Sequence, residues 1–139
     1  MKVLFALLVC LTFLNASSIA VVNSLDGEVV AIKDGSEIAL KVGDDLEESM
    51  TIKTKENSGV SVLFHDDSFL ALGANSSLSL AKYVFDQQAH NFDFELFLDK
   101  GTASFESGKI GKVAPEKFQF KTPEGTVAIR GTKFYVKVN

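Results

Sequence analysis

The chain has 139 residues, 46% of them apolar and 23% charged, which is an ordinary balance for a globular protein. This length suffices for one domain with a proper core and is too short for two. The formal net charge is −4 and the positive residues are scattered without a basic stripe, so a nucleic-acid partner is not expected.

The N-terminal segment has the order of a secretory signal peptide. Lys2 supplies a positive start, residues 3–14 form a nearly unbroken apolar run, and small residues follow from Ala16 to Ala20. The run is shorter than the roughly 18–20 residues that cross a bilayer, so we expect no stable membrane span once the segment is removed. We expect residues 1–16 to be the signal peptide, with cleavage allowed as far as Ala20, and the protein to be periplasmic or otherwise exported. The alternative is that this segment is a buried strand or helix of the fold.

Cys10 is the single cysteine of the chain and lies inside the apolar run. A lipoprotein signal places Cys after a small residue at the end of the run, whereas Val9 precedes Cys10 and the run continues to Leu14. We therefore expect no lipidation. Removal of the segment would leave a chain without cysteine, which excludes disulfides, thiol catalysis and thiolate metal sites.

Beyond Ala20 the apolar residues recur with a period of two, which predicts strands. Asp34-Gly35 is a hairpin signal, Lys100-Gly101 predicts a turn, residues 46–50 predict one helical turn, and residues 108–116 predict a surface loop. Segments with strand character follow in chain order at residues 30–33, 38–42, 51–53, 60–65, 69–72, 78–80, 83–85, 92–98, 102–105, 118–120, 127–129 and 133–138.

The fold class follows from this pattern. Short strands with turns every 8–12 residues predict a single small all-β domain of about ten strands, built as a β-sandwich or a rolled, solenoid-like sheet. The residues with the clearest alternation are expected to form the core; they are Val60, Val62, Phe64, Phe92, Phe94, Leu96, Phe134 and Val136.

Several short motifs follow one another in a characteristic order. They are Gly27-Glu28-Val29, Leu40-x-Val42-Gly43-Asp44, Ile52-x-Thr54, Val62-x-Phe64-x-Asp66-Asp67-Ser68, Gly73-x-Asn75-Ser76-x-Leu78, Leu98-x-Lys100-Gly101, and Thr122-Pro123-x-Gly125 before Ile129-Arg130-Gly131-Thr132-x-Phe134. In this order they resemble the FecR domain over roughly residues 26–138. The resemblance assigns residues 21–139 to a FecR-like β domain.

The resemblance implies protein–protein interaction. The best-known members of this family regulate siderophore and iron-citrate uptake genes, and they carry a cytoplasmic anti-sigma segment, one transmembrane helix and this domain in the periplasm. Here only Met1 and Lys2 precede the apolar run, so we expect no transmembrane relay to a sigma factor. What remains is a stand-alone exported FecR-like module.

Conventional catalytic, metal and cofactor sites are not expected. His65 and His90 are the only histidines, and a metal site needs several convergent ligands. Asp66 and Asp67, beside His65, are interpreted as solvated turn formers, as is Asp44-Asp45. No nucleophile elbow and no Gly-rich loop leading into a helix occurs.

Paired carboxylates are interpreted in the same way. Asp93 and Glu95 lie two apart on a predicted strand, so they share a face, and we expect that face to be wet.

The family-motif residues Arg130, Gly131, Thr132 and Phe134 are the remaining site candidates. We interpret them as a structural bulge that redirects the last strand. The alternative, which the resemblance implies, is self-cleavage at a Gly-Thr bond, because some siderophore-type members are understood to cleave themselves there. The Thr hydroxyl would attack the preceding Gly carbonyl and form an ester that water opens.

We therefore expect an exported periplasmic or envelope module for protein–protein interaction, without conventional catalysis. Two alternatives stay open: an accessory component of a cell-surface signalling or regulatory system, and a structural envelope component. The unknown envelope partner is expected to use the last strand, residues 133–138, as a sheet edge with Lys133 and Lys137 on its outer face. The alternative is that this strand lies inside the sheet between two others.

Overall fold

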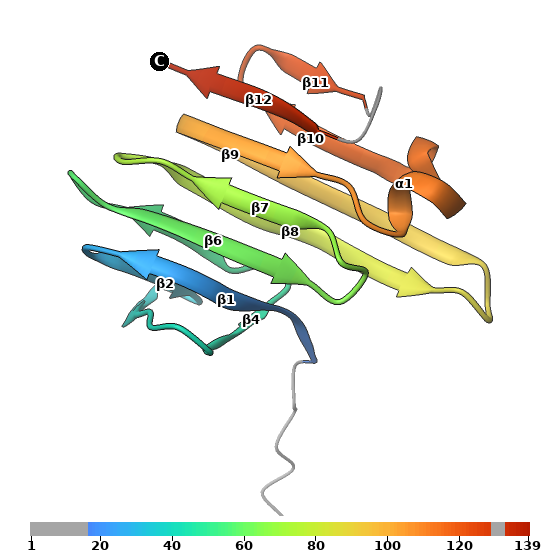
Figure 1. Cartoon of the computed structure of the whole chain (residues 1–139), viewed down its shortest axis with the longest axis horizontal. Helices are drawn as coiled ribbons and strands as arrows, with labels where there is room; N and C mark the ends of the chain where they lie inside the picture. Colours follow the sequence, from blue (N-terminus) through green and yellow to red (C-terminus); the bar gives the residue numbers. More distant parts are fainter. Residues whose placement is uncertain (1–16, 129–132) are drawn as a thin grey trace, which may run out of the picture.

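The computed structural model describes residues 17–128 and 133–139 of the chain. In this part of the chain, twelve strands join one sheet that curls until its two halves face each other (Figure 1). Between β9 and β10 lie two short helical turns, α1 (Ile110–Val113) and η1 (Pro115–Lys117). The strands are β1 (Ser18–Asp26), β2 (Val29–Lys33), β3 (Ser36–Ala39), β4 (Asp45–Glu47), β5 (Thr51–Thr54), β6 (Gly59–Phe64), β7 (Phe69–Leu72), β8 (Ser77–Asp86), β9 (Asn91–Glu106), β10 (Phe118–Thr122), β11 (Gly125–Val127) and β12 (Lys133–Val138).

Strand β9 belongs to both halves of the sheet. Its first part pairs with β8 and β10, and its last part pairs with β7 and β12. One layer therefore runs β4–β1–β6–β7–β9–β12 and the other runs β3–β2–β5–β8–β9–β10–β11. Of the pairs described, only β9–β10 is parallel.

The chain changes layer at Gly101, which has a φ of 98°. This backbone conformation is open to glycine and strained for other residues. A Cβ at this position would also lie 2.5 Å from Ser76 Cα, so Gly101 permits a close approach of two backbones. The expectation that Lys100-Gly101 forms a turn between two strands was therefore wrong, because both residues lie at a bend within one strand.

Aromatic side chains fill the space between the layers. Phe94 on β9 is 1% exposed, and its ring centroid lies 4.7–5.7 Å from those of Phe64, Tyr83, Phe105 and Phe118. Phe64 comes from β6 in one layer and Tyr83 from β8 in the other. These rings therefore join the two layers, in the tilted and edge-on arrangements that aromatic pairs favour.

The structure confirms the all-β class and the curled architecture, with twelve strands where about ten were expected. Asp34-Gly35 forms the predicted hairpin between β2 and β3, with φ values of 50° and 78°. Of the predicted core residues, Val60, Val62, Phe64, Phe94 and Leu96 are buried, whereas Phe92, Phe134 and Val136 are half-buried and pack against the core.

Some predictions at the N-terminal side were wrong. Strand β1 was not predicted at all, and residues 46–50 form strand β4 and a turn in place of a helical turn, because Leu46 pairs with Ala20 of β1 and is buried. The segment at residues 38–42, predicted to have strand character, does not present a core face, since Ile38 and Val42 are 49% and 60% exposed. Strand β3 pairs with β2 alone among the described strands, so it lies at the end of its layer.

The segment at residues 108–116 also differs from the predicted surface loop. It holds α1 and the start of η1, and its apolar residues Ile110 and Ala114 are buried against the core. Hydrogen bonds to the β6–β7 turn fix this segment in place, as described below. No helix among the described residues has the length and apolar character that a membrane span requires.

Candidate functional site

Asp66, in the β6–β7 turn, is fully buried. Its carboxylate accepts hydrogen bonds from the Tyr83 hydroxyl at 3.1 Å, the Ser68 hydroxyl at 2.8 Å and the Ile110 N–H at 3.1 Å. In return the Asp66 N–H donates to Tyr83 Oη at 3.0 Å, and the Lys109 N–H donates to the Asp66 carbonyl at 2.7 Å. Asp66 therefore ties the turn both to β8 and to α1.

The surroundings of this cluster keep the Tyr83 hydroxyl protonated. Burial of the phenol and the neighbouring Asp66 carboxylate raise the pKa of Tyr83 well above its ordinary value. Tyr83 and Asp66 are both buried, so the pair is placed to hold the fold and not to meet a substrate. The expectation of a solvated turn was wrong for Asp66 and is confirmed for Asp67, which is exposed.

A second polar cluster joins the β7–β8 connection to the bend in β9. The Thr54 hydroxyl donates to the Gly73 carbonyl at 2.6 Å and accepts from the Ser76 N–H at 2.9 Å. Ser76 Oγ in turn accepts from the Thr102 N–H at 3.0 Å, next to the close approach at Gly101. The motif residues of the sequence therefore meet in two clusters, one at each end of β7, and both clusters hold strands together.

The structure places only part of the Arg-Gly-Thr-x-Phe motif. Arg130, Gly131 and Thr132 lie outside the described residues, so the bulge and the self-cleavage alternative both stay predictions. Phe134 lies on β12, is half-buried, and has its ring centroid 5.7 Å from Phe105 and 5.4 Å from Phe120. Phe134 therefore anchors β12 to the core.

The candidate metal and carboxylate groups do not converge. His65 is exposed, whereas the Asp66 carboxylate beside it is turned into the cluster described above. Within residues 17–128 and 133–139, no three His, Cys, Asp or Glu side chains gather in a way that could hold a metal ion. Asp93 and Glu95 share the outer face of β9, as expected, but both are half-buried there and not fully wet. Asp93 lies 3.8 Å from Lys82, and Glu95 lies 2.6 Å from Lys121.

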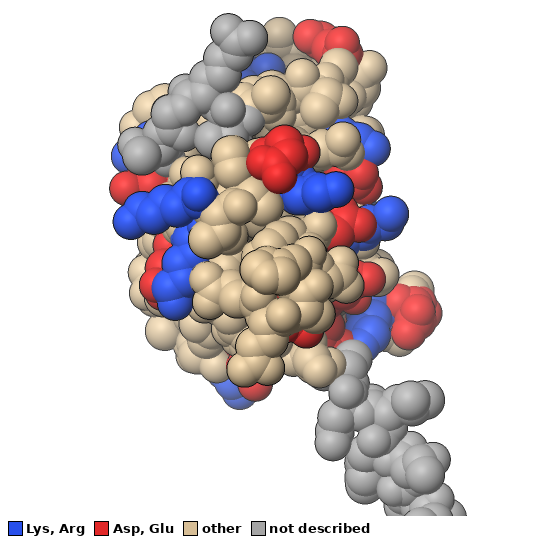
Figure 2. All heavy atoms as spheres, turned by 90° about the vertical axis from the view of Figure 1, so that its right-hand side faces the viewer, with Lys and Arg blue, Asp and Glu red and all other residues tan. Residues whose placement is uncertain are grey.

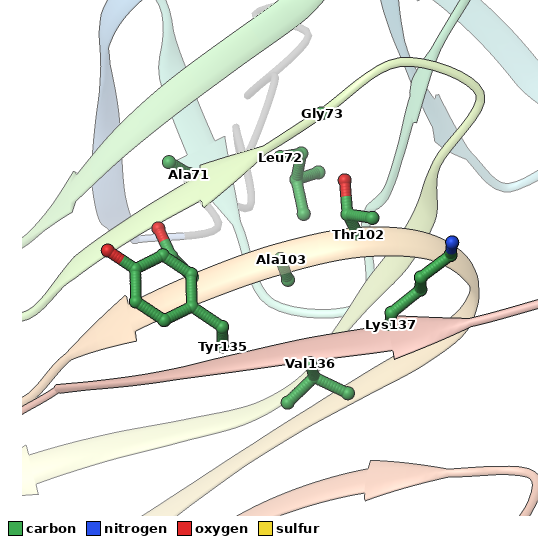
Figure 3. Close-up of a pocket in the computed structure, with 9 residues that line it drawn as sticks. Ala71, Leu72, Gly73, Thr102, Ala103, Tyr135, Val136 and Lys137 are labelled. Carbon is green, nitrogen blue, oxygen red and sulfur yellow. The ribbon is translucent and has the colours of Figure 1, made fainter.

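A shallow groove of about 470 Å³ lies on the outer face of β7, β9 and β12 (Figure 3). Its floor is made of small residues, because Ala71 pairs with Ser104, and Ser104 pairs with Tyr135. Thr102 and Lys137 form the next row across the same strands. The groove is therefore a strip of small side chains beside the outer side chains of β12.

Tyr135 stands at the rim of this groove and is 76% exposed, the highest value among the exposed large apolar side chains described. The Lys133 ammonium lies 5.4 Å from its ring centroid, at cation–π distance. Exposed aromatic residues are typical of interface anchors. Sequence alternation placed Tyr135 outside, because Phe134 and Val136 face the core.

Strand β12 forms a free edge of the sheet, as predicted. Among the described strands it pairs with β9 alone. The Gly73 N–H donates to the Thr102 carbonyl, so the backbone of Thr102 faces β7. Backbone groups alternate in direction along a strand, and Ala103 therefore faces its partner Val136 on β12. By the same alternation, the backbone groups of Tyr135 point outward.

Thr102 and Ser104 were missed as members of a site. The signal was present in the sequence, since they alternate with Ala103 and Phe105, which are buried. Alternation alone shows that they face outward, and only the pairing of β7, β9 and β12 shows that they form one floor.

Charged residues of both signs are mixed across the face of the molecule seen in Figure 2. Lys side chains lie there beside Asp and Glu, and neither sign gathers into a large patch. This agrees with the scattered charges of the sequence.

The comparisons with known proteins identify a family. A family model described as FecR protein matches residues 50–139, a span that runs from the start of β5 to the end of the chain and holds both polar clusters and β12. Neither the curated proteins nor the solved structures gave a match. Because the matched residues make up more than half of the sequence, the chain belongs to the FecR family.

Proposed function

We propose that this protein is an exported interaction module of the cell envelope that works without conventional catalysis. Family membership supports this proposal, since FecR proteins form a regulatory and signalling family and not a catalytic one. They are also typically associated with the envelope. The same membership favours, among the alternatives, an accessory role in a cell-surface signalling or regulatory system over a structural role.

The observation that carries the proposal is the surface at β12. A free strand edge, an exposed Tyr135 and a groove floored by small residues lie next to one another there. An exposed strand edge provides a row of backbone donors and acceptors that a partner strand can pair with. We therefore propose that the partner binds along β12 and covers the groove.

Crosslinking in cells tests this surface. A photo-crosslinking amino acid at Tyr135 should give a discrete adduct with one envelope protein, because a partner on β12 would lie against that side chain. The matched control is Val113 on α1, which is also exposed and belongs to another element of the fold. No adduct from Tyr135, or the same adducts from Val113, would count against β12 as the interface.

The start of β1 supports Ala16 as the position of cleavage in the proposed export. Strand β1 begins at Ser18, and its residues Ile19 and Ala20 are buried. Cleavage after Ala16 would leave β1 whole, whereas cleavage after Ala20 would remove both buried residues. N-terminal sequencing of the protein from the envelope fraction should begin at Ser17; a chain that begins at Met1, or one found in the cytoplasm, would rule out this part of the proposal.

A further inference from the structure

We propose that the β12 edge selects an acidic partner strand, with two carboxylates four residues apart and apolar residues between them on the opposite face. This inference rests on the proposed function, because it specifies the chemistry of the partner that binds along β12. It is carried by the side chains and backbone groups that β12 presents.

The free backbone groups of β12 alternate along the strand. Phe134 and Val136 face β9 through their backbone groups, so the free groups belong to Lys133, Tyr135 and Lys137. These are the residues whose side chains stand on the outer face. An added strand would therefore pair with the backbone of the residues that carry the charged and aromatic side chains.

The side chains define the charge of the edge. Lys133 and Lys137 are exposed, stand on one face four residues apart, and flank Tyr135; β12 has no acidic residue. The chain as a whole has a net charge of −4, so this strand is locally opposite to the rest of the molecule. On the neighbouring strand, Glu106 lies opposite Lys133, whereas Lys137 lies opposite the neutral Thr102.

The charge pattern disfavours a second copy of this chain on the edge. An antiparallel pair centred on Tyr135 would place Lys133 opposite the Lys137 of the other copy on both sides of the axis. Like charges directly opposite each other destabilise a strand pair, whereas opposite charges stabilise it. A strand with carboxylates at these two positions is the complementary occupant.

The inner face sets the other positions. Phe134 and Val136 are only half-buried, so their side chains leave apolar surface at the edge of the core. Residues of the added strand that lie on this face would have to be apolar to extend the core. They occupy the positions between the two carboxylates and the central residue, because side chains alternate between the two faces of a strand. The expected pattern is acidic, apolar, variable, apolar, acidic, with the variable residue beside Tyr135.

Synthetic peptides test this pattern on the purified protein. One peptide has the central sequence Glu-Val-Thr-Val-Glu, and its twin has Lys-Val-Thr-Val-Lys with identical flanks. Fluorescence anisotropy should give the acidic peptide a Kd about tenfold or more below that of the basic twin, because it forms two favourable cross-strand charge pairs. Added salt should narrow the difference, since both lysines are exposed.

Charge reversal on the protein is the decisive variant. Lys133→Glu combined with Lys137→Glu should reverse the preference, so that the basic peptide binds more tightly. The matched control is Lys53→Glu, an exposed lysine within β5 that does not border the β12 edge; it should leave the preference unchanged. Thermal melts should show that the variants are folded, because all three side chains are exposed, with a modest loss of stability for Lys133→Glu, which would face Glu106 on β9.

Three results would overturn the inference. They are equal binding of the two peptides, no binding of either, and a dimer in sedimentation that is lost when Tyr135→Pro removes a free N–H of the edge, which would place a second copy there. The acidic pattern and the proposed function can fail separately. If Tyr135 gives its crosslink in cells while neither peptide binds, β12 remains an interface and only the acidic pattern is wrong. If the acidic peptide is selected but Tyr135 gives no crosslink, the edge prefers acidic strands and the proposed interface in cells is wrong.

Discussion

Tyr83 and Asp66 hold each other through two hydrogen bonds that run in opposite directions. The Tyr83 hydroxyl donates to Asp66 Oδ1 at 3.1 Å, and the Asp66 N–H donates back to Tyr83 Oη at 3.0 Å. The two residues are 17 positions apart and belong to different layers of the sheet. Their contact therefore fastens the β6–β7 turn to β8, next to the aromatic rings of the core.

Loss of the Tyr83 hydroxyl should destabilise the fold. Tyr83→Phe leaves the buried Asp66 carboxylate and N–H each short of one partner, and such unsatisfied groups cost about 1–3 kcal/mol. Urea denaturation measures the change in the free energy of unfolding. Tyr135→Phe removes a hydroxyl from an exposed ring and should cost less than about 0.5 kcal/mol. Equal effects of the two variants would show that the contact contributes nothing.

The same residue predicts an alkaline loss of stability. The pKa of Tyr83 is raised in the folded state, so above about pH 10 the unfolded chain releases a proton that the folded chain keeps. The stability from this group is therefore complete below about pH 10 and falls as the pH rises further. The free energy of unfolding of wild type minus that of Tyr83→Phe should shrink from about pH 10 upward, and a constant difference would contradict the raised pKa.

Phe94→Ala tests the aromatic core. The Phe94 ring lies among four others from both layers, so its removal leaves a cavity, and such changes cost about 3–5 kcal/mol. Phe97→Ala, on the opposite face of the same strand and half-buried, should cost clearly less. A larger loss for Phe97 in denaturant titrations would show that the faces of β9 have been assigned wrongly.

Strands were predictable where apolar residues on the buried face alternate with mostly polar residues on the other face. The alternation at residues 60–65 and 92–98 follows directly from that condition, and β6 and β9 lie there. Strand β1 was not recognised because its apolar residues follow closely on the N-terminal apolar run, which hides their period. At β3 the alternation misled, since Ile38 lies at the end of a layer, beyond the core.

The site was predictable only in part. Alternation from Phe134 onward placed Lys133, Tyr135 and Lys137 on one outer face. The groove floor could not be predicted, because Ala71 and Ser104 meet through β7–β9 pairing, which no local pattern specifies. The burial of Asp66 could not be predicted either, because one of its hydrogen-bond donors, the Ile110 N–H, is 44 positions away in the sequence.

Gly101→Ala should interfere with the change of layer in β9. Alanine there would carry a positive φ and meet Ser76 Cα at 2.5 Å, so a backbone has to move. Gly35→Ala is the matched control, because Gly35 also has a positive φ, of 78°, but nothing lies within 4 Å of its would-be Cβ. The control should cost about 1–2 kcal/mol from strain alone. Gly101→Ala should exceed it by at least about 1 kcal/mol in urea titrations; equal losses would show that the Ser76 contact relaxes freely.

Amide hydrogen exchange tests the edge assignment of β12 residue by residue. If β12 pairs with β9 alone, the amides of Lys133, Tyr135 and Lys137 point outward and should exchange fast. The amides of Phe134 and Val136 donate toward β9 and should exchange slowly, which makes them an internal control within the same strand. Slow exchange at all five amides would mean that both sides of β12 are paired, and the edge would then be unavailable to a partner. Fast exchange at all five would mean that the strand frays as a unit, and the alternating row of free groups on which strand addition depends would not exist.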